Sequence, residues 1–238
     1  MSVSLISYSV PTFSETPADT VFLGLSQCYN SSFTKEDVLA TKETKKNKII
    51  SSVLESGHTS VAEHVSFTFL IEGITITACQ QLTRHRIASY SQRSFRYTEL
   101  EGADWYFVPS SISKDKEALE IYIEAIEHSK KAYNKLKLRN IPQEDARGVL
   151  PVFTKTNIVV TMNARALKNF FAERLCTRAQ KEIRDVAKAM AVLCKKTCPE
   201  IFELAKFAEP KCVQNYGICY EQKCCGKSIS IKNLVDSI

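Results

Sequence analysis

The chain has 238 residues, 44% of them hydrophobic, and its basic and acidic residues give a net charge of 32 − 26 = +6. This length allows a sizeable buried core. The modest positive charge suits phosphorylated small molecules as well as nucleic acid, so charge does not separate these partners. Residues 1–5 lack a basic region followed by an apolar core, and no run approaches the length of a membrane span. We therefore expect a cytoplasmic protein.

The nine cysteines are odd in number and scattered, which favours reduced thiols over a disulfide framework. The tail carries the spacing Cys212-x6-Cys219-x4-Cys224-Cys225 and lacks the Cys-x-x-Cys pair of common zinc sites. Zinc binding and free thiols both stay open for this tail, and no metal ligand is assigned. Six cysteines lie after residue 193: Cys194, Cys198, Cys212, Cys219, Cys224 and Cys225.

The first part of the chain predicts one strand and two helices. Residues 3–10 read as a weak strand, and residues 18–28 as a helix behind the start signal Ser-Glu-Thr-Pro. A second helix is expected to begin with a cap at Thr34 and to end at Gly57. Its middle, Lys42–Lys48, is expected on a solvated face.

The block Gly57-His58-Thr59-Ser60-Val61-Ala62-Glu63-His64 precedes residues 65–71, which are apolar at every second position. This alternation predicts a half-buried strand. Two histidines and a carboxylate could bind zinc, but their spacing is not that of the His-Glu-x-x-His helix motif. Structural roles for both histidines are the alternative.

The middle of the chain predicts mostly helix. Residues 74–83 have helical spacing, residues 105–109 read as a short strand, and residues 113–140 form a long amphipathic helix with mixed charges on its exposed side. A short helix over residues 142–151 carries Arg147 in its last turn, where a positive charge favours the helix dipole.

The last part predicts a strand over residues 152–162, a helix capped by Asn163, and helices over 178–198 and 201–207. No internal repeat or low-complexity linker divides the chain. We expect one domain over residues 1–238, with a cysteine-rich tail at about 211–238.

The helix after Asn163 presents polar residues in two different registers. Arg165 and Asn169 are four residues apart and share a face, whereas Arg174 continues the apolar stripe of Leu167 and Phe170. An unpaired buried charge is costly, so Arg174 must pair with a core carboxylate or face a ligand pocket.

The segment of residues 84–97 contains four arginines, one histidine and three serines, and no acidic residue. The guanidinium groups of arginine and the hydroxyl groups of serine can donate hydrogen bonds to phosphate oxygens, so this segment is a candidate anion-binding site. A solvated basic loop is the plainer interpretation. A nucleic-acid-binding protein that uses Tyr90, Phe95 and Tyr97 as stacking platforms is a further alternative.

Arg84-His85-Arg86, then seven residues, then Ser94 and Arg96, resembles the signature of the flavin-dependent thymidylate synthases, the ThyX family. The block at residues 57–64, Ala-Arg-x-x-Leu-Pro at 146–151 and Asn-Ala-Arg-x-Leu-x-Asn at 163–169 also resemble that family. The resemblance implies an α/β fold of α+β type, a single domain with an antiparallel sheet flanked by long helices. It also implies a homotetramer whose active sites are shared between subunits.

Roles for individual side chains follow from this resemblance. Arg174 would be catalytic, because a guanidinium against the uracil ring favours the ionised ring without losing its own proton. Arg147 would reach the phosphate. The flavin would be bound by His58, Ser60, Arg84, His85, Arg86, Gln92, Asn163, Arg165 and Asn169. The nucleotide would be bound by Gln81, Arg84, Gln92, Arg93, Ser94, Phe95, Arg96, Arg147 and Arg174.

The implied reaction transfers one carbon from methylenetetrahydrofolate to C5 of dUMP and gives dTMP, with NADPH as reductant through bound FAD. No nucleic-acid or membrane partner is implied.

Gln92 stands where many family members have Glu, and Arg93 and Phe95 flank Ser94 where smaller or apolar residues are usual. The early segment Leu25–Tyr29 lacks an expected arginine. No Gly-x-Gly-x-x-Gly fingerprint is present, so the flavin site would not be of the dinucleotide-fold kind.

Overall fold

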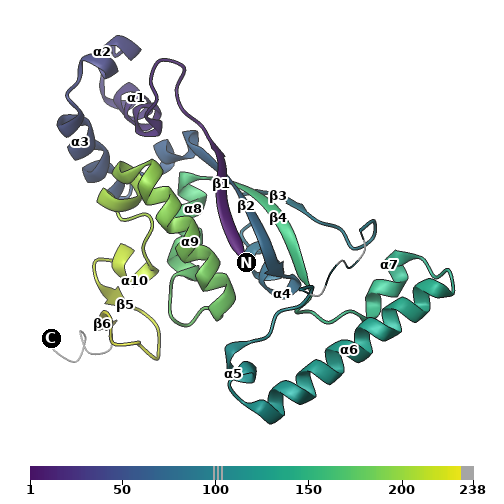
Figure 1. The fold of residues 1–238 in the computed structure, drawn as a ribbon. Helices are drawn as coiled ribbons and strands as arrows, with labels where there is room; N and C mark the ends of the chain where they lie inside the picture. Colours follow the sequence, from purple (N-terminus) through teal and green to yellow (C-terminus); the bar gives the residue numbers. More distant parts are fainter. Residues whose placement is uncertain (99, 101, 103, 232–238) are drawn as a thin grey trace. The chain divides into compact units, whose positions relative to one another are not determined.

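The structure, a computed structural model, describes residues 1–98, 100, 102 and 104–231. Its main sheet has the strand order β1-β2-β4-β3 (Figure 1). The sheet is antiparallel, as expected. Just beyond the ends of β2 and β4, Ala164 N–H donates to Val65 O across 2.8 Å, and Ile76 N–H donates to Thr154 O across 3.0 Å. The strands are β1 (Ser2–Tyr8), β2 (Ser66–Thr75), β3 (Ser89–Gln92) and β4 (Lys155–Asn163).

The chain forms two compact units, and the boundary between them falls within the strands. Unit 1 comprises residues 1–2, 71–84 and 90–159, and unit 2 comprises residues 3–70, 85–89 and 160–238. The sequence-based expectation of a single domain stays a prediction.

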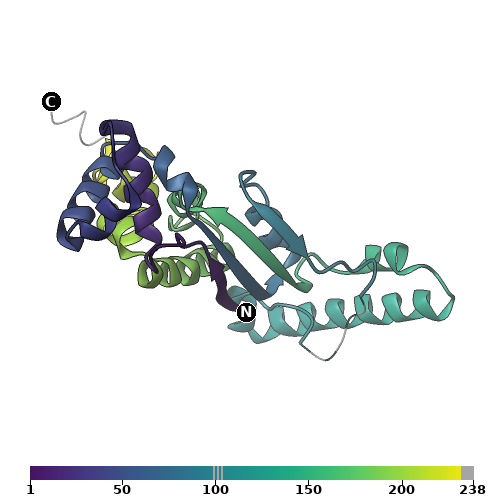
Figure 2. The same cartoon turned by 90° about the horizontal axis from the view of Figure 1, so that it is seen from above.

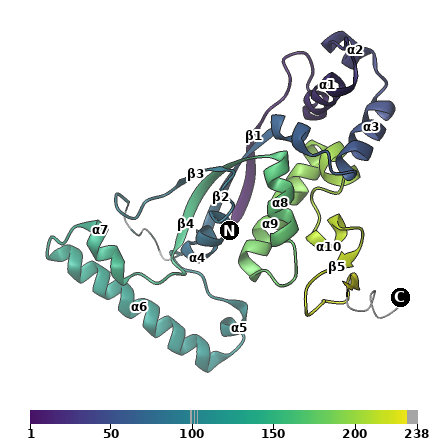
Figure 3. The same ribbon diagram turned by 180° about the vertical axis from the view of Figure 1, so that it is seen from behind.

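Unit 2 contains the larger apolar core. Phe67 on β2 alternates with polar neighbours as predicted, is fully buried, and meets Phe202 edge to face at 5.2 Å. Helices α8 and α9 lie side by side (Figure 3). The helices are α1 (Pro17–Tyr29), α2 (Lys35–Ala40), α3 (Glu43–Glu55), the 3-10 helix η1 (Ser60–His64), α8 (Ala164–Arg174), α9 (Lys181–Thr197) and the π-helix η3 (Glu200–Leu204).

Unit 1 is built on the long helix α6. The short helix α7 lies alongside the C-terminal half of α6 (Figure 2), and Ser129 Oγ on α6 donates to Val149 O across 2.5 Å. This packing fixes the segment that carries Arg147. The helices are α4 (Ile76–Leu82), α5 (Ser110–Ser113), α6 (Lys116–Leu138), α7 (Gln143–Ala146) and the 3-10 helix η2 (Arg147–Val149).

Two predicted elements differ from the structure, and a third begins later than expected. The helix expected from Thr34 to Gly57 has its predicted capping box but is broken at Thr41, whose backbone is extended and whose hydroxyl bonds back to Asp37 O. The helix expected over 113–140 is confirmed as the single helix α6, which begins at Lys116 because Asp115 caps its start. The strand expected over 105–109 is a single bridge between Tyr106 and Thr154.

The solvated face expected for Lys42–Lys48 is wrong at one position. Lys46 Nζ lies 2.5 Å from Asp19 Oδ1, and the two side chains are only 12% and 5% exposed. Asp19 also accepts a hydrogen bond from Ser14 Oγ at 2.6 Å. Lys46 therefore belongs to a buried ion pair that joins α3 to α1.

The tail contains α10 (Lys211–Gln214) and the short parallel strands β5 (Ile218–Cys219) and β6 (Ile229–Ser230), which the sequence did not predict. Residues 232–238 of the predicted tail lie outside the described residues. Among the helices that the structure describes, none combines the length and hydrophobicity needed to cross a bilayer.

Candidate active site

The second half of the basic segment, residues 90–97, belongs to unit 1, where it continues β3 and then turns. Arg93 N–H donates to Asn157 O across 2.9 Å, and one terminal guanidinium nitrogen of Arg93 donates to Lys155 O across 3.1 Å. The Arg93 guanidinium also lies 5.2 Å from the centre of the Phe95 ring, which is buried. The backbone after β3 is thus anchored to β4, with Ser94 held between two residues that pack inward.

This segment and the Ala-Arg-x-x-Leu-Pro motif line one open groove of about 470 Å³. Ser94 and Arg147 are 53 positions apart in the chain (147 − 94), and the fold of unit 1 brings them into the same groove. The hydroxyl, amide and guanidinium groups among its lining residues suit a phosphorylated ligand. The groove is lined by Ile76, Gln92, Arg93, Ser94, Phe95, Glu144, Arg147, Gly148 and Leu150.

A carboxylate occupies part of this groove. Glu144 forms an ion pair with Nε of Arg96, while Arg147 Nε donates to the backbone oxygen of Glu144 across 3.2 Å. Sequence reasoning missed Glu144. It lies three residues before Arg147, but no local pattern indicates its approach to Arg96.

The remaining predicted nucleotide-binding residues of unit 1 differ in exposure and position. Gln81 is half-buried on α4, and Arg84 is exposed just beyond the end of that helix. Gln92 is exposed at the end of β3 and lines the groove. Unit 1 thus brings Gln92, Arg93, Ser94, Phe95 and Arg147 to one surface, with Arg96 tied to it through Glu144.

In unit 2 three of the predicted flavin residues, Asn163, Arg165 and Asn169, lie at the start of α8, whereas His85 lies near its end. Asn163 caps the helix as predicted, since its Oδ1 accepts from Ala166 N–H at 2.8 Å. Arg165 and Asn169 are both exposed on the following turn. Arg165 forms an ion pair with Glu63 of η1, a partner that sequence reasoning also missed.

The Glu63 ion pair joins α8 to the block that contains His58 and Ser60. Gly57 ends α3 as predicted, with a φ of +98° that a side chain would strain. His58 and Ser60 are exposed immediately after it. Exposed imidazole, hydroxyl, amide and guanidinium donors therefore stand on two adjacent elements of unit 2, a donor set that suits the heteroatoms and phosphates of a flavin.

Two further predicted site residues, Arg174 and His85, contact each other in unit 2. Arg174 Nε donates to His85 Nε2 across 3.1 Å, and the imidazole meets Phe170 edge to face at 5.0 Å. Burial and the Arg174 charge lower the pKa of His85 from 6.5 to about 4. The imidazole is thus neutral, with its proton on Nδ1. The alternatives for Arg174 were a core carboxylate or a ligand pocket; its Nε bonds to an imidazole, and Arg174 also lines a cavity of about 230 Å³.

The aromatic residues of the basic segment do not form stacking platforms. Phe95 is buried, and the hydroxyl of Tyr90 donates to Leu82 O across 2.9 Å. Tyr97 is exposed, with the Arg96 guanidinium 5.3 Å from its ring centre. Arg86 is exposed in the turn before β3. The nucleic-acid alternative therefore lacks the row of open rings that it requires.

Relatives of this chain share most of its length. The family described as "Thymidylate synthase complementing protein" matches residues 5–200. The flavin-dependent thymidylate synthase of Clostridium tetani is 40% identical over 251 aligned positions, which cover 98% of this chain and 96% of that protein. That of Pyrococcus furiosus is 37% identical over 224 positions, covering 92% of this chain and 91% of that protein.

A solved structure has the same fold. The UMP/dUMP methylase PolB from Streptomyces cacaoi, bound with 5-Br dUMP, superposes with a TM-score of 0.74 at 26% sequence identity. The match covers 88% of this chain and 96% of that chain.

Proposed function

Because this chain belongs to the family of flavin-dependent thymidylate synthases, we propose that it converts dUMP to dTMP, with methylenetetrahydrofolate as carbon donor and NADPH as reductant through FAD. The observation that carries the proposal is the groove of unit 1, where the basic segment and Arg147 face the same space. PolB, the similar methylase, is bound with a dUMP analogue. The cytoplasmic location stays a prediction from the sequence.

The nucleotide phosphate is assigned to the groove of unit 1. Arg147 and the hydroxyl of Ser94 supply a charge and a donor there, and Arg96 would exchange Glu144 for the phosphate. A phosphate dianion competes well with one exposed carboxylate for a guanidinium. This exchange would place Arg96 beside the nucleotide only when the nucleotide is bound.

Arg174 is assigned to the uracil ring. Its guanidinium stays protonated, and its contact with neutral His85 fixes the orientation of the guanidinium plane. A fixed positive charge beside the ring stabilises negative charge that develops at N3 and O2, which makes C5 a better nucleophile. Because His85 is neutral, it does not cancel the charge of the guanidinium, as a carboxylate partner would.

FAD is assigned to unit 2. The chemistry of the exposed donors His58, Ser60, Arg165 and Asn169 fits this cofactor, and Asn163 holds the helix that presents two of them. Bound FAD would supply hydride transfer between NADPH and the transferred carbon. The protein residues bind and orient it, and Glu63 holds Arg165 in place from η1.

The homotetramer with shared active sites also belongs to this proposal. Helix α6 supports it, because Ile121 and Leu138 are 64% and 84% exposed while only Ile126 and Tyr133 of that helix are buried. A long helix that exposes apolar side chains gains stability by packing against another copy. Light scattering of the purified chain would measure the assembly directly, and a monomer would refute this part.

The function is tested by following dTMP formation chromatographically from dUMP, methylenetetrahydrofolate and NADPH, with and without added FAD. We expect FAD-dependent product from the wild type. The matched controls are Arg174→Ala, which should make almost no product, and Arg139→Ala, an exposed arginine at the end of α6 that should behave as the wild type. Absence of dTMP from folded, FAD-loaded protein would overturn the proposal.

A further inference from the structure

A carboxylate lines the groove of unit 1 to which the nucleotide phosphate is assigned. The Glu144 side chain is 44% exposed and forms an ion pair with Nε of Arg96, whose side chain is 51% exposed. A negative group on the wall of a phosphate site opposes binding, because like charges repel. The proposed function gives Glu144 a partner to lose but no role once the nucleotide is bound.

The backbone of Glu144 is fixed within unit 1, so its carboxylate stays beside the groove after Arg96 has turned to a phosphate. Asp145 N–H and Ala146 N–H donate to Pro142 O across 3.0 and 2.9 Å. The Ala146 side chain is fully buried, and α7 lies alongside α6 (Figure 2). The Glu144 side chain can change rotamer, but the helix keeps it at the wall of the groove.

Arg147 is held by the same residue. Its Nε donates to Glu144 O across 3.2 Å, and across the described residues this is the one hydrogen bond of the Arg147 guanidinium. Both terminal nitrogens can therefore donate to a phosphate group. A phosphate bound there lies close to Glu144, because the backbone of Glu144 positions the guanidinium that binds it.

The charges of the groove match a single phosphate group. One terminal guanidinium nitrogen of Arg93 donates to Lys155 O across 3.1 Å, so this side chain is directed toward β4. The cations of the groove that can turn to a ligand are Arg96 and Arg147. Their two positive charges balance a phosphate monoester, whose charge is about −2 at neutral pH. A second phosphate group would bring further negative charge beside Glu144 when both cations are already engaged.

We propose that Glu144 makes this site selective for nucleoside monophosphates over nucleoside diphosphates and triphosphates. The inference rests on the proposed function, since it requires that the groove binds the phosphate of a uracil nucleotide. The first phosphate group displaces the carboxylate from Arg96, and the displaced carboxylate then repels any further phosphate group. Glu144 is thus a specificity-determining residue for the proposed reaction.

The test compares the affinities of dUMP and dUDP by calorimetric titration in magnesium-free buffer, because Mg²⁺ would neutralise the added phosphate group. The wild type should bind dUMP about tenfold more tightly than dUDP, as expected for one repulsive contact at a half-exposed site. Glu144→Gln keeps the shape of the side chain and removes its charge, so it should bind the two nucleotides within about threefold of each other. Asp145→Asn is the matched control, because this exposed neighbour lies outside the lining of the groove, and it should keep the wild-type preference.

A variant that retains the charge separates repulsion from damage to α7. Glu144→Asp keeps a carboxylate and should keep most of the preference for dUMP. Added sodium chloride should shrink the preference of the wild type more than that of Glu144→Gln, because salt screens charges at exposed sites.

Two results would overturn the inference. Equal tightening of dUMP and dUDP binding in Glu144→Gln would show that Glu144 only competes for Arg96. Equal binding of both nucleotides by the wild type would show that no selectivity exists. A wild type that binds neither nucleotide would instead refute the proposed function of the groove, and the inference with it.

Discussion

Arg174 Nε donates a hydrogen bond to His85 Nε2 across 3.1 Å, joining the end of α8 to the turn before β3. A cation and an imidazole are compatible here only because the imidazole is neutral, with a pKa lowered to about 4 by burial and by Arg174. His85 is thus a fixed acceptor that orients the guanidinium. Its protonation would place two positive charges in contact.

Stability should depend on pH through His85. The unfolded state takes up the proton near pH 6.5 and the folded state only near pH 4, so the unfolded state binds more protons between these values. The His85 contribution is therefore fully present above about pH 6.5 and is lost as the pH falls toward about 4. Thermal unfolding midpoints across this range should drop more steeply for the wild type than for His85→Gln, which accepts the same bond without titrating. His128→Gln, on the exposed surface of α6, is the control, and equal slopes in all three proteins would refute the assignment.

Arg174→Ala should lower kcat/KM for dUMP by about a thousandfold, because it removes charge that acts on the transition state. Arg174→Lys should recover only a small part, since an ammonium lacks the planar fork that meets both His85 and the ring. Steady-state kinetics at saturating FAD measure both variants. An effect confined to KM would show that Arg174 only binds the substrate.

Arg147→Ala should weaken dUMP binding by about tenfold to a hundredfold, as expected for a lost charge-assisted hydrogen bond. Deoxyuridine, which lacks the phosphate, should bind the variant and the wild type equally. Calorimetric titration with both ligands separates a phosphate contact from general damage to the groove. Arg139→Ala should leave both affinities unchanged, and an equal loss for both ligands in Arg147→Ala would contradict the phosphate role.

Arg165→Ala should release FAD, with an affinity lower by about tenfold or more, because an exposed guanidinium on α8 is lost. Glu63→Gln should weaken FAD less, since it only frees Arg165 from its ion pair. Flavin absorbance of the purified proteins and fluorescence titration measure these affinities. Lys188→Ala, exposed on α9, provides the control for loss of a surface charge. Unchanged flavin content in Arg165→Ala would remove this residue from the cofactor site.

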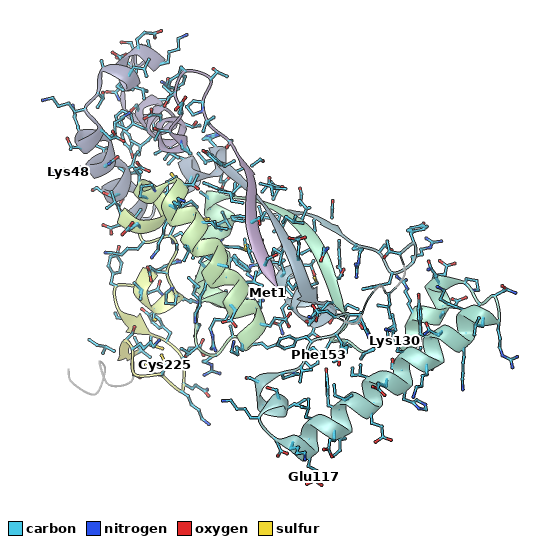
Figure 4. The ribbon with its side chains drawn as sticks, viewed as in Figure 1. Met1, Lys48, Glu117, Lys130, Phe153 and Cys225 are labelled. Carbon is cyan, nitrogen blue, oxygen red and sulfur yellow. The ribbon has the colours of Figure 1, made fainter. Side chains whose placement is uncertain are left out.

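Lys46→Ala should lower the free energy of unfolding by about 3–5 kcal/mol, because it leaves the Asp19 carboxylate buried without its cation. Lys48→Ala, two residues further on the exposed side of α3 (Figure 4), should change it by less than about 0.5 kcal/mol. Urea unfolding measures both. Equal, small effects would show that the Ser14 hydroxyl alone satisfies Asp19.

The sequence by itself determined the local structure and the family. Alternation over residues 65–71 predicted the buried side of β2, and Asn163 and Thr34 predicted helix starts, because caps and periodicity depend on neighbours a few residues away. The motifs around Ser94 and Arg147 indicated the family by the same local logic. The helix break at Thr41 was missed, because it depends on a bond from the Thr41 hydroxyl to the backbone oxygen of Asp37.

Only the tertiary structure decided which distant side chains meet. Glu144 with Arg96, Glu63 with Arg165 and Arg174 with His85 join residues separated by dozens of positions. Such contacts follow from the packing of helices on one another and on the sheet, which no spacing along the chain encodes. The sequence could therefore name the residues of the candidate site, while the fold of each unit decided their partners, charges and exposure.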